Sequence, residues 1–269
     1  MGMLTEYEEK QITAIDEWKK QEPGVVSKVT GVVSAPLAFI TRKVIPEAAM
    51  KAVLNGANSA GEFLADEGDI CRDGNVNSIT ELLHKDLRTS DRLADEVHDW
   101  AIAMAGAEGG AAGAAGVVGI ALDIPAVLTL ALRTIHKIGL CYGYRANNKE
   151  DRDYVLGILS AAGANSQAEK NEALIALRTV YVIVQKHTWK KIGEKAAEKR
   201  FGSEAAIIAV KNLCKQLGIN FSKRKAMQVI PVVGGAIGAA VNADFIRDVG
   251  YAARRSYQER WLRDNEKWM

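Results

Sequence analysis

Five polar residues recur every three or four positions, and four of them, two histidines and two aspartates, could bind a metal ion or transfer protons. The five are His84, Arg88, Asp91, Asp95 and His98. This spacing predicts one face of a helix, and imidazoles and carboxylates are ligands for divalent metals. However, His84 and His98 would lie about 21 Å apart along such a helix, too far to share one ion. We therefore interpret the five residues as a solvated or paired polar face, and predict neither a metal site nor a cofactor.

Asp123 and Arg133 form a second candidate polar site, because each interrupts an apolar stretch of the chain. An unpaired charge in such surroundings is costly, so the two side chains could pair with each other. The simpler interpretation is that Asp123 caps a helix just before Pro125 and that Arg133 lies at the surface or at the level of lipid phosphates. We favour the simpler interpretation and keep the buried pair as the alternative.

No motif in the sequence predicts a catalytic residue. The chain contains neither G-x-S-x-G nor the phosphate-binding G-x-x-x-x-G-K-[ST]. Cys71, Cys141 and Cys214 are widely spaced and form no C-x-x-C, which argues against a zinc ribbon or a disulfide framework and for a reducing compartment. Cys141 and Cys214 are expected to be core thiols.

Basic residues outnumber acidic ones between residues 186 and 225, where Trp189 and Phe201 also lie. Such a segment suits an anionic lipid surface, where each basic residue contributes about 1 kcal/mol; an ordinary solvated face is an equally good interpretation. The formal net charge is only +2, so we predict no nucleic-acid partner. The candidate headgroup contacts are Lys190, Lys191, Lys195, Lys199, Arg200, Lys223, Arg224 and Lys225.

Two apolar stretches rich in glycine have to be positioned by the surrounding helices. Residues 101–132 carry only two charges, Glu108 and Asp123, and residues 226–243 carry none. Glycine costs about 1 kcal/mol relative to alanine in a helix, so these runs need close helix packing or lipid insertion as a benefit. The glycines concerned are Gly109, Gly110, Gly113, Gly116, Gly119, Gly234, Gly235 and Gly238.

The uncharged segment 109–122 is shorter than the roughly 20 residues that span a bilayer. The sequence Asp123-Ile124-Pro125 predicts a break before the next apolar piece, since proline disrupts a helix interior. We therefore expect each glycine-rich stretch to form a helical hairpin segment that is either buried or interfacial.

The remaining chain shows helical periodicity and no alternation typical of strands. Thr5 with Glu8, and Ser166 with Glu169, have the spacing of capping boxes, and Ser203 and Gly218 bracket a further helix. We expect a loop at residues 67–77, a helix at 78–100, a charged turn at 147–153 and a polar helix at 244–269. The predicted fold is all-α: one multi-helix bundle over residues 1–269, with N-terminal helices in 1–77, a glycine-rich central hairpin in 78–145 and C-terminal helices in 146–269.

The order of four sequence blocks resembles the EcsC protein family. These blocks are AIDEW near the start, AEGGAAGAAG, DIPAVLTLALRTIHKIGLCYGY and IPVVGGAIGAAVNADF, and they extend from Ala14 to about Tyr257. The family is named for a protein encoded beside the ATPase and permease of an ABC transporter. The resemblance therefore implies a helical fold and a membrane connection, and it supplies no catalytic residue.

These observations favour a non-enzymatic protein on the cytoplasmic face of a membrane, with the lipid surface as its partner and a transporter or another membrane protein as a further one. A soluble helical scaffold for a protein partner is one alternative. A hydrolase or lipid-modifying enzyme with a site built from His84, Asp91, Asp123 or Arg133 is another. A bilayer-perturbing effector that stores its inserting segments in a soluble bundle is the last.

Overall fold

The computed structural model describes residues 3–23, 47–114, 116–164, 166–192 and 234–268, and these residues contain no strand. The predicted all-α class and multi-helix bundle are confirmed. The helices are α1 (Glu6–Lys20), α3 (Glu47–Leu64), α4 (Gly68–Asp73), the 3₁₀-helix η2 (Ile79–His84), α5 (Leu87–Ala114), α6 (Gly116–Cys141), α7 (Lys149–Ala162), α8 (Gln167–Ile192) and α10 (Gly234–Asp264).

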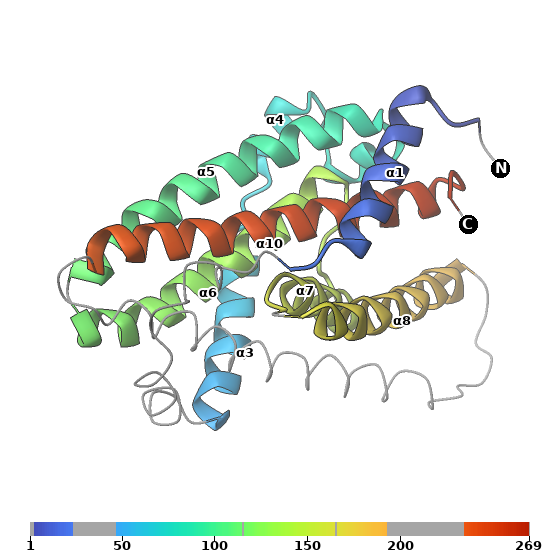
Figure 1. Cartoon of the computed structure of the whole chain (residues 1–269). Helices are drawn as coiled ribbons and strands as arrows, with labels where there is room; N and C mark the ends of the chain where they lie inside the picture. The colour runs from blue at the N-terminus through green and yellow to red at the C-terminus, as the bar shows by residue number, and fades with distance from the viewer. Residues whose placement is uncertain (1–2, 24–46, 115, 165, 193–233, 269) are drawn as a thin grey trace.

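The centre of the bundle consists of α5, α6 and α10, which pack lengthwise against one another (Figure 1). Small buried side chains, among them Ala101 and Ala105 on α5 and Ala253 on α10, allow the helix axes to approach closely. A Cβ on Gly250 of α10 would stand 2.1 Å from Cδ2 of His98 on α5, so this contact requires glycine.

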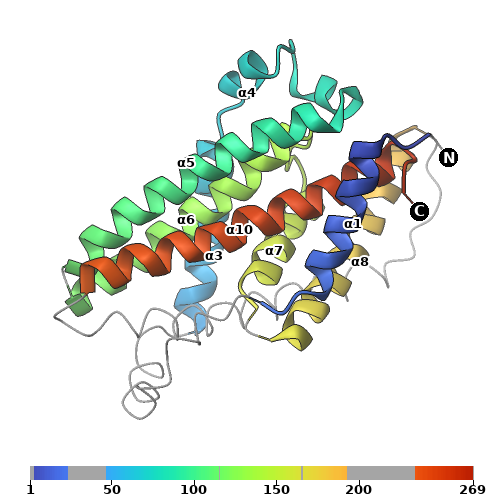
Figure 2. The same cartoon turned by 45° about the horizontal axis from the view of Figure 1, so that its top comes forward.

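The glycine-rich segments meet at one end of the bundle. The hairpin between α5 and α6 turns within the first segment, because α5 ends at Ala114 and α6 begins at Gly116. The start of α10, at Gly234, lies at the same end, whereas both chain termini lie at the opposite end (Figures 1 and 2). Residues 226–233 of the second stretch lie outside the described residues.

Three sequence predictions of element boundaries were wrong, besides that of a single helix at 78–100, which the structure divides between η2 and α5. Pro125 does not break the helix, since α6 continues through it. Burial of neighbours such as Val127 and Leu128 offsets the cost of a proline in the helix interior. The expected loop at 67–77 contains α4. The expected charged turn at 147–153 instead begins α7, because the Asn148 side chain accepts a hydrogen bond from the Asp151 backbone nitrogen (2.8 Å) and caps the helix.

Other boundaries follow the sequence. The capping box of Thr5 and Glu8 is present at the start of α1, and Ser166 accepts from the backbone nitrogen of Glu169 at 3.2 Å ahead of α8. The polar helix expected from residue 244 is the second part of α10, which begins ten residues earlier in the glycine-rich stretch. The helix expected between Ser203 and Gly218 lies outside the described residues.

Helix α3 crosses α6 and is held there by a buried polar pair. His136 Nε2 on α6 lies 2.8 Å from Asn58 Oδ1 on α3. Burial lowers the pKa of His136 to about 4, so the imidazole is neutral at pH 7 and Nε2–H donates to the amide oxygen. Three residues farther along α3, Gly61 packs directly on the α6 backbone at Leu132 and Arg133.

Replacing Gly61 by alanine is expected to lower the free energy of unfolding by about 1–3 kcal/mol. The new Cβ would stand 2.7 Å from the Arg133 backbone nitrogen, and backbone cannot move aside cheaply. Gly56→Ala in the same helix is the matched control: no atom lies within 4 Å of its Cβ, so alanine should stabilise by up to about 1 kcal/mol. Urea unfolding followed by circular dichroism measures both, and a fully stable Gly61→Ala variant would contradict the close α3–α6 contact.

Candidate functional site

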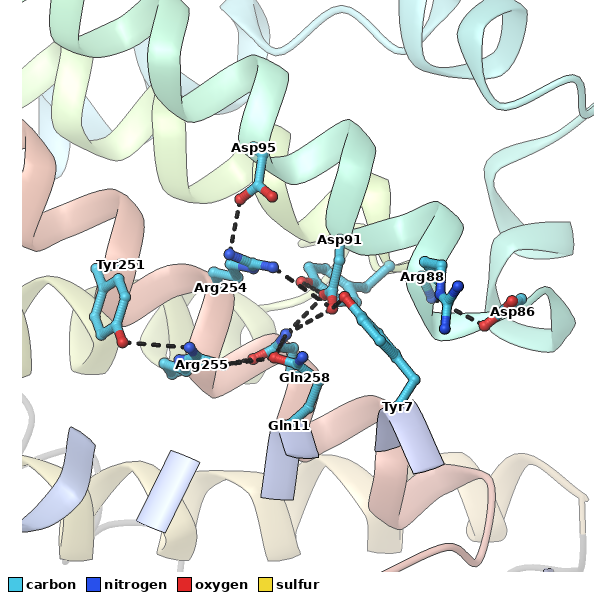
Figure 3. Close-up of polar contacts among 11 residues, drawn as sticks. Tyr7, Gln11, Asp86, Arg88, Asp91, Asp95, Tyr251, Arg254, Arg255 and Gln258 are labelled. Atoms are coloured by element: carbon cyan, nitrogen blue, oxygen red, sulfur yellow. Dashed lines mark hydrogen bonds and ion pairs between the residues drawn. The ribbon is translucent and has the colours of Figure 1, made fainter. Parts of the chain in front are cut away.

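The most highly connected polar group in the described residues is the carboxylate of Asp91, in the second turn of α5. Asp91 is 1% exposed. One oxygen accepts a hydrogen bond from the Tyr142 hydroxyl at the end of α6, and the other accepts from the Tyr7 hydroxyl of α1 at 2.6 Å. The Gln258 amide of α10 donates to both oxygens at 2.8 Å (Figure 3). Four helices therefore meet at one carboxylate.

Arg254 of α10 supplies the positive charge beside this carboxylate. Its Nη2 lies 3.6 Å from Asp91 Oδ2, and its Nη1 lies 2.9 Å from Asp95 Oδ1, one turn farther along α5 (Figure 3). Asp95 is half-buried, and desolvation raises the pKa of its carboxyl group. One guanidinium thus joins two of the five residues that the sequence placed on one face.

The polar network continues from Gln258 towards α1. The Arg255 guanidinium donates to the side-chain oxygens of Gln258 (2.8 Å) and Gln11 (2.9 Å), and it stacks on the Tyr251 ring. Gln11 also accepts from the Gln258 amide at 3.1 Å. Gln258 and Arg255 are buried, so their polar groups depend on these partners for hydrogen bonds.

A second buried cluster surrounds Arg260, one turn nearer the C-terminus of α10. Its guanidinium lies 3.2 Å from Asp151 of α7 and 3.8 Å from Asp264, and it stacks on the rings of Tyr144 and Tyr154. Asp264 in turn accepts from the Tyr144 hydroxyl at 2.8 Å. This cluster ties α7 to α10.

Tyr257 links the two clusters through ring stacking. Its ring lies 6.3 Å from that of Tyr142 in the first cluster and 5.8 Å from that of Tyr144 in the second. A Cβ on Gly139 would stand 2.8 Å from the Tyr257 ring, so the glycine in α6 makes room for it. The two clusters therefore form one continuous polar and aromatic seam along α10.

The five-residue face predicted from the sequence is divided between two elements. His84 is exposed at the end of η2, and α5 begins only at Leu87, where Asp86 accepts from the Arg88 backbone nitrogen and starts the new helix. The prediction that all five share one helix was wrong, because this local cap competes with helix continuation. His98 lies farther along α5, and its Nε2 makes a hydrogen bond with the Arg247 carbonyl at 3.1 Å.

The other candidate polar residues lie apart from the Asp91 cluster. The Nε of Arg133 donates to the Leu64 carbonyl at 3.1 Å, and its guanidinium stacks on Trp100, 4.6 Å from the ring centroid. Asp123 lies inside the continuous helix α6, so the favoured prediction that it caps a helix before Pro125 was wrong. Its side chain is not among those described, so its pairing with Arg133 stays a hypothesis. Within the described part of the chain, no three His, Cys, Asp or Glu side chains gather as a metal site would require.

The predicted lipid-facing residues lie mostly where side chains are not described. Lys190 and Lys191 belong to the last turn of α8, without described side chains, and the basic residues from Lys195 to Lys225 lie outside the described residues. The glycines of both apolar stretches lie on the helix ends that meet at one end of the bundle. Among the described residues, no helix is both long and apolar enough to cross a membrane.

The geometry of the Asp91 cluster suits a structural clamp. Both carboxylate oxygens already accept hydrogen bonds, so the group has no free oxygen with which to take a proton from a substrate. Burial and the neighbouring carboxylate raise the pKa of Tyr142 well above its usual value, so its hydroxyl remains a donor. Sequence reasoning had singled out Asp91 and Asp95 but missed Tyr7, Tyr142 and the residues of α10.

Comparisons with known proteins find one matching family and one relative that covers most of the chain. The profile of the EcsC protein family matches residues 9–262. An uncharacterized protein of Bacillus subtilis (strain 168), YdbA, is 24% identical over 270 residues, which cover 96% of this chain and 94% of that protein. No solved structure matches the chain significantly.

Asp91→Asn is expected to lower the free energy of unfolding by about 2–4 kcal/mol, because an amide NH₂ would face existing donors and Arg254 would lose its buried counter-charge. Asp95→Asn is the matched control on the same helix. Its carboxylate is half exposed and Arg254 keeps Asp91, so a loss below about 1 kcal/mol is expected. Urea denaturation of both variants provides the measurement, and equal losses would contradict the central role of Asp91.

Six of the seven tyrosines are expected to stay protonated in the native protein above pH 10, because burial raises the pKa of Tyr7, Tyr142, Tyr144, Tyr154, Tyr181 and Tyr257. In the unfolded chain a tyrosine ionises near pH 10. The stabilisation is therefore complete below pH 10 and is lost as the pH rises beyond it. Absorbance at 295 nm, recorded with circular dichroism, should show these six ionising together with unfolding; ionisation of them in the folded protein near pH 10 would refute the seam.

Proposed function

This chain belongs to the EcsC protein family, and we propose that it works at a membrane surface, with the glycine-rich end of the bundle as the part that contacts the bilayer. One observation carries the proposal. The two glycine-rich apolar stretches are far apart in the sequence, yet their helices meet at a single end of the bundle, away from the polar seam and both termini.

The dimensions of this end suit shallow insertion. Residues 109–114 of α5 and 116–122 of α6 carry no charge, and each run extends about 10 Å at 1.5 Å per residue. Interfacial helices bury their apolar parts about 5–10 Å deep, whereas the hydrocarbon core is about 30 Å thick. The uncharged tip therefore has the length to enter one leaflet.

Helix dipoles at the same end favour an anionic surface. Both α6 and α10 begin there, and neither has an acidic residue in its first turn. The partial positive charge of these two N-termini is therefore uncompensated by carboxylates of their own helices, and it attracts anions such as lipid phosphates. The C-terminus of α5 at this end opposes only one of the two dipoles.

The basic segment between Lys190 and Lys225 completes the proposal. Its lysines and arginines contact anionic headgroups, and the cytoplasmic leaflet is the surface whose negative potential attracts them. A position beside a membrane transporter, as the name-giving protein of the family suggests, would place the chain at this same leaflet.

Flotation with vesicles tests the proposal, and Gly116, the first residue of α6, offers a matched pair of variants. Aspartate and asparagine have the same shape and both favour a helix N-terminus, so Gly116→Asp and Gly116→Asn should fold alike. Gly116→Asp brings a negative charge to the bilayer, which costs about 1 kcal/mol, or about fivefold in binding. Gly116→Asn should float with anionic vesicles like the unmodified chain.

The salt dependence of flotation separates the two contacts. Flotation that persists at high salt assigns binding to insertion of the glycine-rich end, whereas flotation lost at high salt assigns it to the basic segment. Failure of the unmodified chain to float with either neutral or anionic vesicles would refute the proposal. Equal flotation of the two Gly116 variants would exclude the glycine-rich end as the part that contacts the bilayer.

A further inference from the structure

The N-terminal helix α1 is attached to the bundle largely through polar contacts. In its first turn, the Tyr7 hydroxyl donates to the buried Asp91. In its second turn, the Gln11 side-chain oxygen accepts from Arg255 at 2.9 Å and from Gln258 at 3.1 Å. These contacts connect α1 to α5 and α10 (Figure 3).

The C-terminal end of α1 is capped by side chains of α8. The Lys170 ammonium donates to the carbonyl oxygens of Trp18 and Gln21 and lies over the Trp18 ring. The Gln167 amide donates to the Lys19 carbonyl at 2.9 Å. The last carbonyls of a helix lack partners within the helix and carry its negative dipole end, so a lysine there is matched to that end.

The apolar part of the α1 interface is small. Ile15 and Trp18 are the large apolar side chains that α1 buries fully, and Tyr7 and Ile12 are partly buried. The other buried side chain of α1 is Glu8, which pairs with Lys267 at 3.3 Å. A 15-residue helix held in this way can open separately from a core of fully buried helices.

The groups beneath α1 remain satisfied when α1 leaves. Without the Tyr7 hydroxyl, Asp91 keeps Tyr142, Gln258 and Arg254 as partners. Lys170 is 4% exposed, and desolvation lowers its pKa to about 8, so opening returns its ammonium to water. Release of α1 therefore leaves neither Asp91 nor Lys170 as an isolated buried charge.

We propose that α1 is the displaceable internal occupant of a helix-binding groove formed by α5, α8 and α10, and that the groove accepts an amphipathic helix from a protein partner. The groove defines both the direction and the sequence pattern of the helix that it binds. Asp91 accepts a hydrogen bond from a hydroxyl near the N-terminus of the bound helix. At the other end, Lys170 and Gln167 donate to the last carbonyl oxygens of that helix. A Trp and an Ile three positions before it supply the apolar contact.

This interaction is distinct from membrane contact, because α1 lies on the half of the bundle opposite the glycine-rich end (Figure 2). The partner helix carries a tyrosine or another hydroxyl donor in its first turn and tryptophan in its last. The carbonyl groups in the last turn of this partner helix have no capping partner of their own. Recognition of this type is helix-in-groove binding, with an internal segment as the competitor.

The test uses a fluorescein-labelled synthetic peptide of residues 3–21 and the full chain. In the variant Tyr7→Phe with Gln11→Ala, α1 loses the hydrogen bonds that these two side chains make to α5 and α10 but keeps the carbonyls that Lys170 and Gln167 cap, and every groove residue is retained. Weakening the internal competitor should increase the apparent affinity for the peptide at least about tenfold over the unmodified chain. Glu6→Ala with Lys10→Ala is the matched control, since these exposed residues pair only with each other, and it should leave the affinity unchanged.

Fluorescence anisotropy measures peptide binding, and amide hydrogen exchange of the unmodified chain provides an independent readout. The inference expects α1 amides to exchange through an opening that leaves α5 and α10 protected. Exchange of α1 only together with α5 and α10 would overturn it. Equal peptide affinity of the two double variants, with α5 and α10 still protected in both, would overturn it as well.

Discussion

Burial of the Asp91 carboxylate constrains the arrangement of the whole bundle. An isolated carboxylate in an apolar interior is too costly to keep, so the fold has to bring donors to both of its oxygens. The donors come from α1, α6 and α10, and Arg254 adds a positive charge. Because each donor occupies a fixed position on its helix, satisfying one carboxylate fixes the relative position and rotation of α5, α6 and α10, and α1 supplies a further donor. Directly after Tyr142 the chain turns at Gly143, whose φ of +86° glycine permits. This turn keeps the tyrosine beside Asp91.

The two ends of the bundle are built on different physical principles. At the end that carries the termini, the buried Arg260 and Asp151 form a network with the exposed Asp264 and with tyrosine hydroxyls, in which each polar group depends on the others. At the glycine-rich end, the sequences of α5, α6 and α10 carry no charge; those of α5 and α10 are largely glycine and alanine, and that of α6 adds valine, isoleucine and leucine. Separating the helices at the glycine-rich end exposes no buried ion pair of the seam. Separating them at Asp91 would break the contact of its carboxylate with Arg254. The seam can therefore hold α5 and α10 together while the opposite end adapts to a surface.

Local features of the fold could be predicted from the sequence, and long-range ones could not. The capping box at Thr5 and the helix cap at Ser166 follow from residues three positions apart, whereas the turn between α5 and α6 lies at residues 114–116 and not at the predicted Pro125. Asp91 was visible as a candidate, but its partners are 84, 51 and 167 residues away in the chain, and no spacing rule connects them. The helix at 244–269 was predicted to be polar because it is rich in arginine, although it also contains tryptophan. Phe245, Val249 and Trp261 between them indicate a buried stripe, which is the sequence signal that could have placed Gln258 against the core.

The same long helices that join the two ends also keep their interactions separate. Asp91 and Gly113 lie 22 positions apart on α5, which corresponds to about 33 Å at 1.5 Å per residue. A helix bound in the α1 groove and a bilayer at the glycine-rich tip therefore contact different surfaces of one rigid pair, α5 and α10, and do not compete for space. Binding at the groove leaves Asp91 with a full set of donors whether the hydroxyl comes from α1 or from a partner. The bundle can thus exchange one helix at its polar end without altering the end that we propose to meet the membrane, as the proposed role of holding a partner at a membrane surface requires.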